Sequence, residues 1–291
     1  MNQINEEELE LAQIYKCSFN QPPQNEEKYG KKLLLIRHAL SEFNFKYERI
    51  FIENPQLQRT DPTLIDLRVS LEYIDGPLHQ IGEKQCISHQ DQVAKIETEL
   101  VLISPLQRTL QTAILLFQKH PNRQNIKFLV YPWLSESLNC ANCISNQIYG
   151  AMREKYLKEA SKHNIQLDFS ILDDKKIFPT QLQWQIESME NNENYKELAK
   201  NVTSEQQYAE HLSEQMRKMY PDFYETWDLM LKRSENLKNK LKEILKEQQK
   251  TVTVVSHCNI LKCLTKVRVD EKGWVHGIHI NNCGMTYYNF D

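Results

Sequence analysis

The sequence predicts an α/β fold in which a mostly parallel sheet lies between two layers of helices. Runs of aliphatic and β-branched residues, typical of strands that are buried on both faces, alternate along the chain with amphipathic patterns of helical period. Such alternation favours a parallel sheet covered by helices. One long segment, residues 137–219, is polar and mostly helical in pattern and contains no comparable run. We therefore expect a three-layer αβα fold with a helical cap insertion.

Composition and charge limit the possible functions of the chain. Of its 291 residues, 40% are apolar and 26% are charged, which indicates a globular protein, and the formal net charge is −3. A broad affinity for nucleic acid or acidic membranes is not expected, so a site for an anion must be local. The seven cysteines lack disulfide-framework spacing, no apolar run approaches transmembrane length, and the acidic N-terminus differs from a secretory or mitochondrial signal. These features predict a cytoplasmic protein.

The chain divides into an arm, a core and an insertion. Residues 1–30 are predicted to be an N-terminal arm outside the core, with a short acidic helix over Glu6–Tyr15 before a polar loop. Residues 31–136 and 220–291 are predicted to form the α/β core, and residues 137–219 the helical cap within the same domain.

The first strand of the core, Leu33–Ile36, is followed at once by Arg37 and His38. Ser41 can then cap a helix that begins near Glu42. In open α/β sheets ligands bind outside the carboxyl ends of the strands. The first strand therefore delivers an arginine and a histidine to the edge where a site is expected.

The next elements repeat this arrangement. Residues 45–74 predict a partly packed excursion over the surface, and a turn at residues 75–82 leads into an amphipathic helix. The second strand, Leu100–Ile103, precedes a helix with proline in its first turn and Arg108 about one turn inside.

Two further strands bring a carboxylate and a second histidine to the same edge. The third strand, Lys127–Tyr131, precedes Glu136, and the fourth, Thr251–His257, ends in histidine. A long amphipathic helix, predicted to be capped by Asp222, leads to the fourth strand. The alternating tail, residues 284–290, predicts a last strand.

These residue types suit phosphoryl chemistry. Guanidinium groups bind two phosphoryl oxygens at once and stay charged, and an unprotonated imidazole such as that of His38 can attack phosphorus. Glu136 could then protonate the leaving oxygen, while His257 could donate a hydrogen bond to the equatorial oxygens. Glu154 and Glu159 are alternative acids.

Five short motifs occur in order, and together they are far more specific than any one of them. The motifs comprise Arg37, His38, Ala39, Ser41 and Asn44; Pro77, Leu78, Gly82 and Gln85; Ser104, Pro105, Arg108 and Thr112; Leu134, Ser135 and Glu136; and Val254, Val255, Ser256 and His257. With them, the chain resembles the histidine phosphatase superfamily, also called phosphoglycerate mutase-like, over about residues 31–136 and 220–291.

The resemblance implies a role for each matching residue. His38 would be the phosphorylated nucleophile and Glu136 the general acid. The phosphate pocket would comprise Arg37, Arg108, His257 and, as an auxiliary donor, Asn44. The resemblance implies no metal and no other cofactor.

The predicted function is therefore hydrolysis of a phosphomonoester through a phosphohistidine on His38, without a metal. A mutase-type phosphotransferase is the nearest alternative, but mutases of this family carry a Glu-Arg-His-Tyr-Gly run at the acid, whereas Ser137 follows Glu136 here. A catalytically weak binding or structural subunit is the other alternative, because Ala39 and Cys258 stand where the family usually has glycine.

The predicted partner is a small phosphorylated substrate or phosphate, with neither nucleic acid nor a membrane. The N-terminal arm or the helical insertion could also contact another protein. The pair Cys140 and Cys143 has a spacing found in zinc and redox sites, but no second cysteine pair or suitably spaced histidine pair accompanies it, so we interpret both as ordinary residues.

Overall fold

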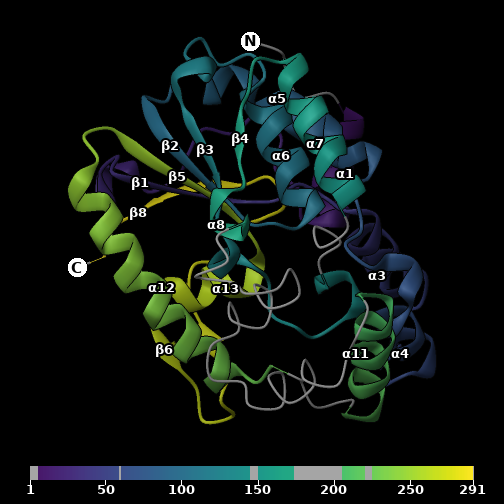
Figure 1. Cartoon of the computed structure of the whole chain (residues 1–291). Coiled ribbons are helices and arrows are strands. Elements are labelled where there is room, and N and C mark those ends of the chain that lie inside the picture. The colour runs from purple at the N-terminus through teal and green to yellow at the C-terminus, as the bar shows by residue number, and fades with distance from the viewer. Residues whose placement is uncertain (1–5, 59, 145–149, 174–204, 220–224, 291) are drawn as a thin grey trace.

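The computed structural model describes residues 6–58, 60–144, 150–173, 205–219 and 225–290. A six-stranded sheet with helices on both faces lies at its centre (Figure 1). The order of the strands is β4-β3-β2-β5-β1-β8, and only β8 runs antiparallel to its neighbour. The strands are β1 (Leu33–Arg37), β2 (Thr98–Ile103), β3 (Lys127–Val130), β4 (Leu167–Asp168), β5 (Thr251–Ser256) and β8 (Met285–Tyr288). The predicted α/β fold is confirmed.

Alternate residues of the strands face two different helix layers, as the pleat requires. Leu34 and Ile36 of β1 belong to the core beneath α5, α6 and α7, whereas Leu33 and Leu35 belong to the core beneath α12 and α13 (Figure 1). These helices are α5 (Gln80–Val93), α6 (Gln107–Phe117), α7 (Gly150–Lys162), α12 (Trp227–Glu247) and α13 (Cys258–Leu264). Burial on both faces explains why the strands are continuous apolar runs.

Shorter elements surround these layers. The remaining helices are α1 (Glu6–Tyr15), α2 (Glu26–Tyr29), α3 (Glu42–Glu53), α4 (Pro62–Val69), α8 (Ser170–Asp173) and α11 (Glu205–Met219). Four 3₁₀ helices, η1 (Leu71–Tyr73), η2 (Arg123–Asn125), η3 (Pro132–Leu134) and η4 (Ala141–Cys143), and a hairpin of β6 (Arg268–Val269) and β7 (Val275–His276) complete the described elements. The excursion over residues 45–74 thus contains most of α3, and α4 and η1.

Of the two helix N-caps predicted from the sequence, one is confirmed, and the other helix begins after a different residue. Ser41 caps α3 as predicted, since its Oγ accepts the N–H of Asn44 at 3.2 Å. Helix α12 instead begins after Thr226, whose hydroxyl accepts the N–H of Leu229. Asp222, the predicted cap, lies outside the described residues. Because Thr226 directly precedes the first helical residue and has an extended backbone, it meets the requirements of an N-cap.

Part of the predicted N-terminal arm is buried, which corrects the expectation that residues 1–30 lie outside the core. Helix α1 spans the predicted residues, but Cys17 and Phe19 after it are 3% and 1% exposed, and they cluster with Leu40 and Ile81. Gln24 forms backbone hydrogen bonds with both neighbours of Thr286 in β8. The arm is held because it covers apolar surface beside α5 and the edge strand.

The segment predicted as a helical cap also contributes to the central layers. Helix α7 packs on α6, and the two-residue strand β4 pairs with β3, with Leu167 opposite Phe128. Helix α11 packs on α4. The division into core and cap stays a prediction. Among the described residues, no helix combines the length and the apolar character needed to cross a membrane.

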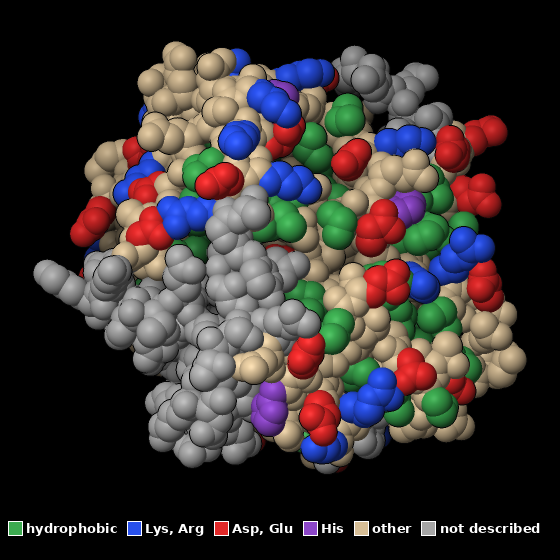
Figure 2. Space-filling view, turned by 45° about the vertical axis from the view of Figure 1, so that its right-hand side comes forward, with side chains coloured by type: hydrophobic (Ala, Val, Ile, Leu, Met, Phe, Trp, Pro, Cys, Tyr) green, Lys and Arg blue, Asp and Glu red, His purple; other side chains and the backbone are tan. Residues whose placement is uncertain are grey.

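Charges of both signs are mixed on the surface. On the face that Figure 2 presents, Lys and Arg side chains lie between Asp and Glu side chains. This distribution fits the net charge of −3 and indicates that an anion would be attracted only at a local site.

Candidate active site

His38 follows β1 directly at the carboxyl edge of the sheet. Its backbone N–H donates to Ser256 O at 2.9 Å, which extends the pairing of β1 with β5 by one residue. His38 is 3% exposed, and its ring Nδ1 lies 2.7 Å from the carbonyl oxygen of Ala39. A carbonyl can only accept, so this contact assigns the proton to Nδ1 and leaves the lone pair of Nε2 available.

His257 stands beside His38 because β5 is the neighbouring parallel strand. The ring centroids of the two histidines are 5.1 Å apart, and His257 is fully buried. Its Nε2 lies 2.7 Å from Ser104 Oγ, at the end of β2, while its Nδ1 has no hydrogen-bond partner among the described residues.

The two arginines are each anchored through one nitrogen. Arg108, in the first turn of α6, donates from Nη1 to the carbonyl of Asn142 at 2.9 Å. Arg37, at the end of β1, donates from Nη1 to the carbonyl of Ile280 at 3.1 Å. The Nε atoms of both arginines are buried and have no partner in the part of the chain that the structure describes. Buried donors are nearly always paired, so both Nε atoms are available to an acceptor that binds at this edge.

Burial and the arginine charges hold both histidines neutral. Burial is the main cause that lowers the pKa of His38 well below its usual value, followed by the positive charges of Arg108 and Arg37. The pKa of His257 is lowered well below its usual value by burial first and then mainly by Arg108. At neutral pH the ring of His38 is therefore a neutral base with a free Nε2.

Glu136 follows η3, beyond the carboxyl end of β3, and is 8% exposed. Its Oε1 accepts the N–H of Ser137 at 2.8 Å, and its Oε2 accepts the N–H of Asn259, in the first turn of α13, at 3.2 Å. Glu136 thus lies next to the segment that carries His257. The alternative acids are on α7, where Glu154 is exposed and Glu159 forms an ion pair with Lys162.

The side chain of Asn44 has no described hydrogen bond to the other predicted site residues. It lies in the first turn of α3 and is partly buried, and its described hydrogen bond is the backbone donation to Ser41. The other predicted site residues come together at the carboxyl edge of the sheet, but no described contact joins the side chain of Asn44 to them.

The two positions where the resemblance leads one to expect glycine do not require it. Neither Ala39 nor Cys258 is among the described residues with a left-handed backbone. Ala39 is buried, and its N–H donates to Thr112 Oγ1 at 3.0 Å. Cys258 is the first residue of α13 and is partly exposed. An ordinary side chain therefore fits the backbone at both places.

Gly82 and Gln85 of α5 hold the segment after His38. A Cβ atom at Gly82 would lie 2.2 Å from the carbonyl oxygen of Leu40, so only glycine allows this close approach. The side-chain oxygen of Gln85 accepts the N–H of Leu40 at 2.9 Å, and its amide donates to the carbonyls of Ser18 and Asn282. The spacing of Gly82 and Gln85 thus places both residues against the backbone that leaves His38.

Gly82→Ala is expected to lower the free energy of unfolding by about 1–3 kcal/mol, because the methyl group has no room against the Leu40 backbone. Urea unfolding measures the change. Glu83→Ala, at the exposed neighbouring position of the same helix, is the control and should change stability little. Equal midpoints for Gly82→Ala and the unsubstituted protein would contradict the close approach.

Sequence reasoning missed several contacts at this edge. The hydroxyl of Ser104 and the carbonyl of Asn142 are bonded to His257 and Arg108, although neither residue type by itself indicates such a role. Cys140 and Cys143 lie with their sulfur atoms 3.3 Å apart, and the hydrogen bond from Cys143 is the main cause that lowers the pKa of Cys140 to about 7. The described residues contain no group of three potential ligands for a metal ion.

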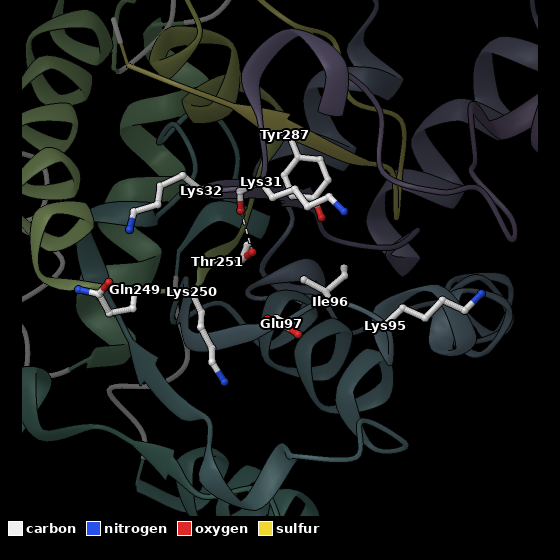
Figure 3. A pocket seen from close by; sticks show the side chains of 9 residues that line it. All are labelled: Lys31, Lys32, Lys95, Ile96, Glu97, Gln249, Lys250, Thr251 and Tyr287. Atoms are coloured by element: carbon white, nitrogen blue, oxygen red, sulfur yellow. Dashed lines mark hydrogen bonds between the residues drawn. The ribbon is translucent and has the colours of Figure 1, made fainter.

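A cavity of about 510 Å³ lies elsewhere, at the edge where β1, β2 and β5 begin. Lys31, Lys32, Lys95 and Lys250 line it (Figure 3). Their side chains point in different directions, Lys31 pairs with Glu26, and Lys32 donates to the carbonyl of Gln248. Because the ammonium groups do not converge, this cavity is a poorer candidate for anion binding than the carboxyl edge.

Among the comparisons with known proteins, those with solved structures found matches. No family model matches the chain, and no curated protein matches its sequence. Several solved structures do match most of the chain. An ecdysone phosphate phosphatase from Bombix mori, in complex with tungstate, is 13% identical, with 87% of this chain and 86% of that chain covered and a TM-score of 0.39.

Two further structures match in a similar way. A mycobacterial glucosyl-3-phosphoglycerate phosphatase with VO3 is 13% identical, with 88% and 89% of the two chains covered and a TM-score of 0.41. A phosphoglycerate mutase from Bacillus anthracis is 15% identical, with 89% and 93% covered and a TM-score of 0.41. Similarity at this level carries no information about activity, so a function has to be argued from the site itself.

Proposed function

We propose that the protein is a phosphomonoester hydrolase that needs no metal and forms a phosphohistidine on His38. The observation that carries the proposal is a set of three buried nitrogen atoms without partners among the described residues, Arg37 Nε, Arg108 Nε and His257 Nδ1. They belong to residues at the same sheet edge as a histidine with a free Nε2. A phosphoryl group would supply oxygens for these nitrogens and an electrophile for His38.

The first step is phosphoryl transfer to the enzyme. The lone pair of His38 Nε2 forms a bond to phosphorus, and the ester P–O bond breaks, with its electron pair going to the leaving oxygen. Glu136 gives its proton to that oxygen, so the alcohol departs neutral. Arg37, Arg108 and His257 bind the three equatorial oxygens, on which the negative charge is spread.

The second step restores the enzyme. Water attacks phosphorus and gives a proton to the Glu136 carboxylate, the P–N bond breaks, and its electron pair returns to Nε2. Phosphate leaves, and His38 and Glu136 are again in their starting states. The contact of Nδ1 with the Ala39 carbonyl keeps the ring in one tautomer throughout.

The alternatives differ in the fate of the phosphoryl group. A mutase would return it to a second hydroxyl, and a binding subunit would form no phosphohistidine. The backbone at Ala39 and Cys258 accepts those residues without a left-handed conformation, which removes one reason for expecting an inactive chain. We favour hydrolysis over mutase action because Ser137 follows Glu136, where the resemblance associates mutases with a different run of residues.

A panel of phosphomonoesters tests the proposal on the intact protein. We expect release of inorganic phosphate from an aryl phosphate, and an acid-labile, base-stable phosphoenzyme when the reaction is quenched early. Activity should persist in excess chelator, because the arginine charges, and not a metal, bind the phosphoryl oxygens. No phosphate release and no phosphoenzyme with any ester would refute the proposal, and phosphate exchange between two alcohols would favour the mutase.

A further inference from the structure

A buried ion pair lies behind the turn that carries Glu136. Arg233 of α12 and Glu225, two residues before that helix, form a two-pronged contact, Nε to Oε1 at 2.8 Å and Nη2 to Oε2 at 3.1 Å. Both side chains are only 1% exposed. Burying such a pair seldom adds net stability compared with apolar residues, so its presence calls for another reason.

Each partner of the pair also binds the main chain of the Glu136 turn. Arg233 Nη1 donates to the carbonyl of Ser135 at 2.9 Å, and to that of Trp133 at 3.4 Å. Glu225 Oε2 accepts the N–H of Leu138 at 3.0 Å. The pair therefore forms hydrogen bonds with the backbone one residue before Glu136 and two residues after it.

Other hydrogen bonds hold the turn at different atoms. The carboxylate of Glu136 binds the N–H groups of Ser137 and Asn259, and the amide of Asn259 donates to Ser137 Oγ at 2.9 Å. Those bonds fix the carboxylate relative to α13, and Ser256 Oγ at the end of β5 donates to the carbonyl of Leu134 at 2.7 Å. Among the described residues, the hydrogen bonds that tie the Ser135 carbonyl and the Leu138 N–H to other elements come from Arg233 of α12 and from Glu225. Helix α12 thereby links the acid-bearing turn to the helix layer.

We infer that Glu225 and Arg233 are positioning residues that hold Glu136 for proton transfer and so let the enzyme act on esters with poor leaving groups. The inference rests on the proposed function. A phosphoryl group leaves 4-nitrophenolate without help from an acid, whereas an alkoxide needs a proton as the bond breaks. General acids contribute about 10²–10⁴-fold when they are well placed, and a displaced acid loses this contribution.

Three esters of graded leaving-group basicity test the inference: 4-nitrophenyl, phenyl and benzyl phosphate. All carry one aromatic ring, so they differ mainly in the oxygen that must be expelled. The measured quantity is kcat/KM, which covers the steps up to phosphoenzyme formation. For Glu225→Gln and Arg233→Met we expect the loss to rise along the series and to be at least about 10-fold greater for benzyl than for 4-nitrophenyl phosphate.

A double variant guards against loss of folding. Glu225→Leu with Arg233→Met replaces the ion pair by apolar side chains, which often preserves stability but cannot bind the turn. We expect the same graded loss. Arg123→Met is the matched control, because Arg123 also donates to main-chain carbonyls, those of His163 and His120, but lies in η2, away from the site. Its losses should be equal for all three esters.

Glu136→Gln links the effect to the acid. If the pair acts through Glu136, adding Arg233→Met to Glu136→Gln should cause no further graded loss, because the contribution is already gone. Equal losses for all three esters in the pair variants, or a further graded loss in the Glu136→Gln background, would overturn the inference while leaving the proposed function intact. Absence of hydrolysis by the unsubstituted protein would instead overturn the proposed function, and the inference with it.

Discussion

His38→Ala is expected to reduce kcat/KM for aryl phosphates by at least about 10³-fold and to abolish the phosphoenzyme. The reason is that Nε2 of His38 is the only nitrogen of the proposed site that has both a free lone pair and a tautomer fixed by the protein, through the contact of Nδ1 with Ala39. His257 is not expected to take its place, because its Nε2 contacts Ser104 and its Nδ1 is proposed to donate to a phosphoryl oxygen. The measurement is phosphate release together with quenched labelling of the protein.

His120→Ala is the control for His38→Ala. His120 is also buried, at 2% exposed, and its Nε2 lies 2.9 Å from the carbonyl of Ile96, but it follows α6 at the far end from the site. Its loss should lower stability and leave phosphoenzyme formation in the folded fraction unchanged. If His38→Ala kept turnover and labelling, the nucleophile would lie elsewhere and the proposed mechanism would be wrong.

Arg108→Ala is expected to lower kcat/KM by about 10²–10³-fold and to move the acid limb of its pH profile to higher pH. The loss in rate follows from removal of one group that binds developing charge. The shift follows from the pKa of His38, which burial and then the charge of Arg108 hold below its usual value. Removing that charge raises the pKa of His38 toward its usual value, so the ring becomes protonated, and unable to attack, at a higher pH.

Arg108→Lys separates the two effects. Lysine keeps the positive charge but cannot present two N–H groups in a plane, so the rate should fall while the acid limb stays near that of the unsubstituted protein. The ionisation of the substrate is the same in every profile and cancels in the comparison. An unchanged limb in Arg108→Ala would contradict the electrostatic coupling of Arg108 to His38.

The buried histidines also predict how stability depends on pH. The pKa values of His38 and His257 are lowered in the folded protein. The unfolded chain therefore binds more protons than the folded protein as the pH falls into the usual histidine range. Their contribution therefore lowers the free energy of unfolding as the pH falls through that range, and it vanishes at higher pH, where both states are neutral. Urea unfolding at a series of pH values measures this dependence.

The central strands, and the sheet edge at which we propose the site, follow from local patterns in the sequence. Leu33–Ile36 and Thr251–His257 are strong local signals because a strand buried on both faces must be apolar throughout. Parallel pairing then carries Arg37, His38 and His257 to one edge without any further information, since each residue directly follows or ends its strand. The cap at Ser41 was equally local.

The way in which the chain outside those strands is used depends on contacts between distant elements. The burial of Cys17 and Phe19 depends on α5 and β8, and β4 is a strand only because β3 lies beside it. The hydrogen bonds from Glu225 and Arg233 to the Glu136 turn join residues 87 and 98 positions apart in the chain, and no sequence motif connects them. Periodicity indicates which face of an element is buried. The partners of a buried polar side chain depend on packing between distant elements, so no local pattern predicts them.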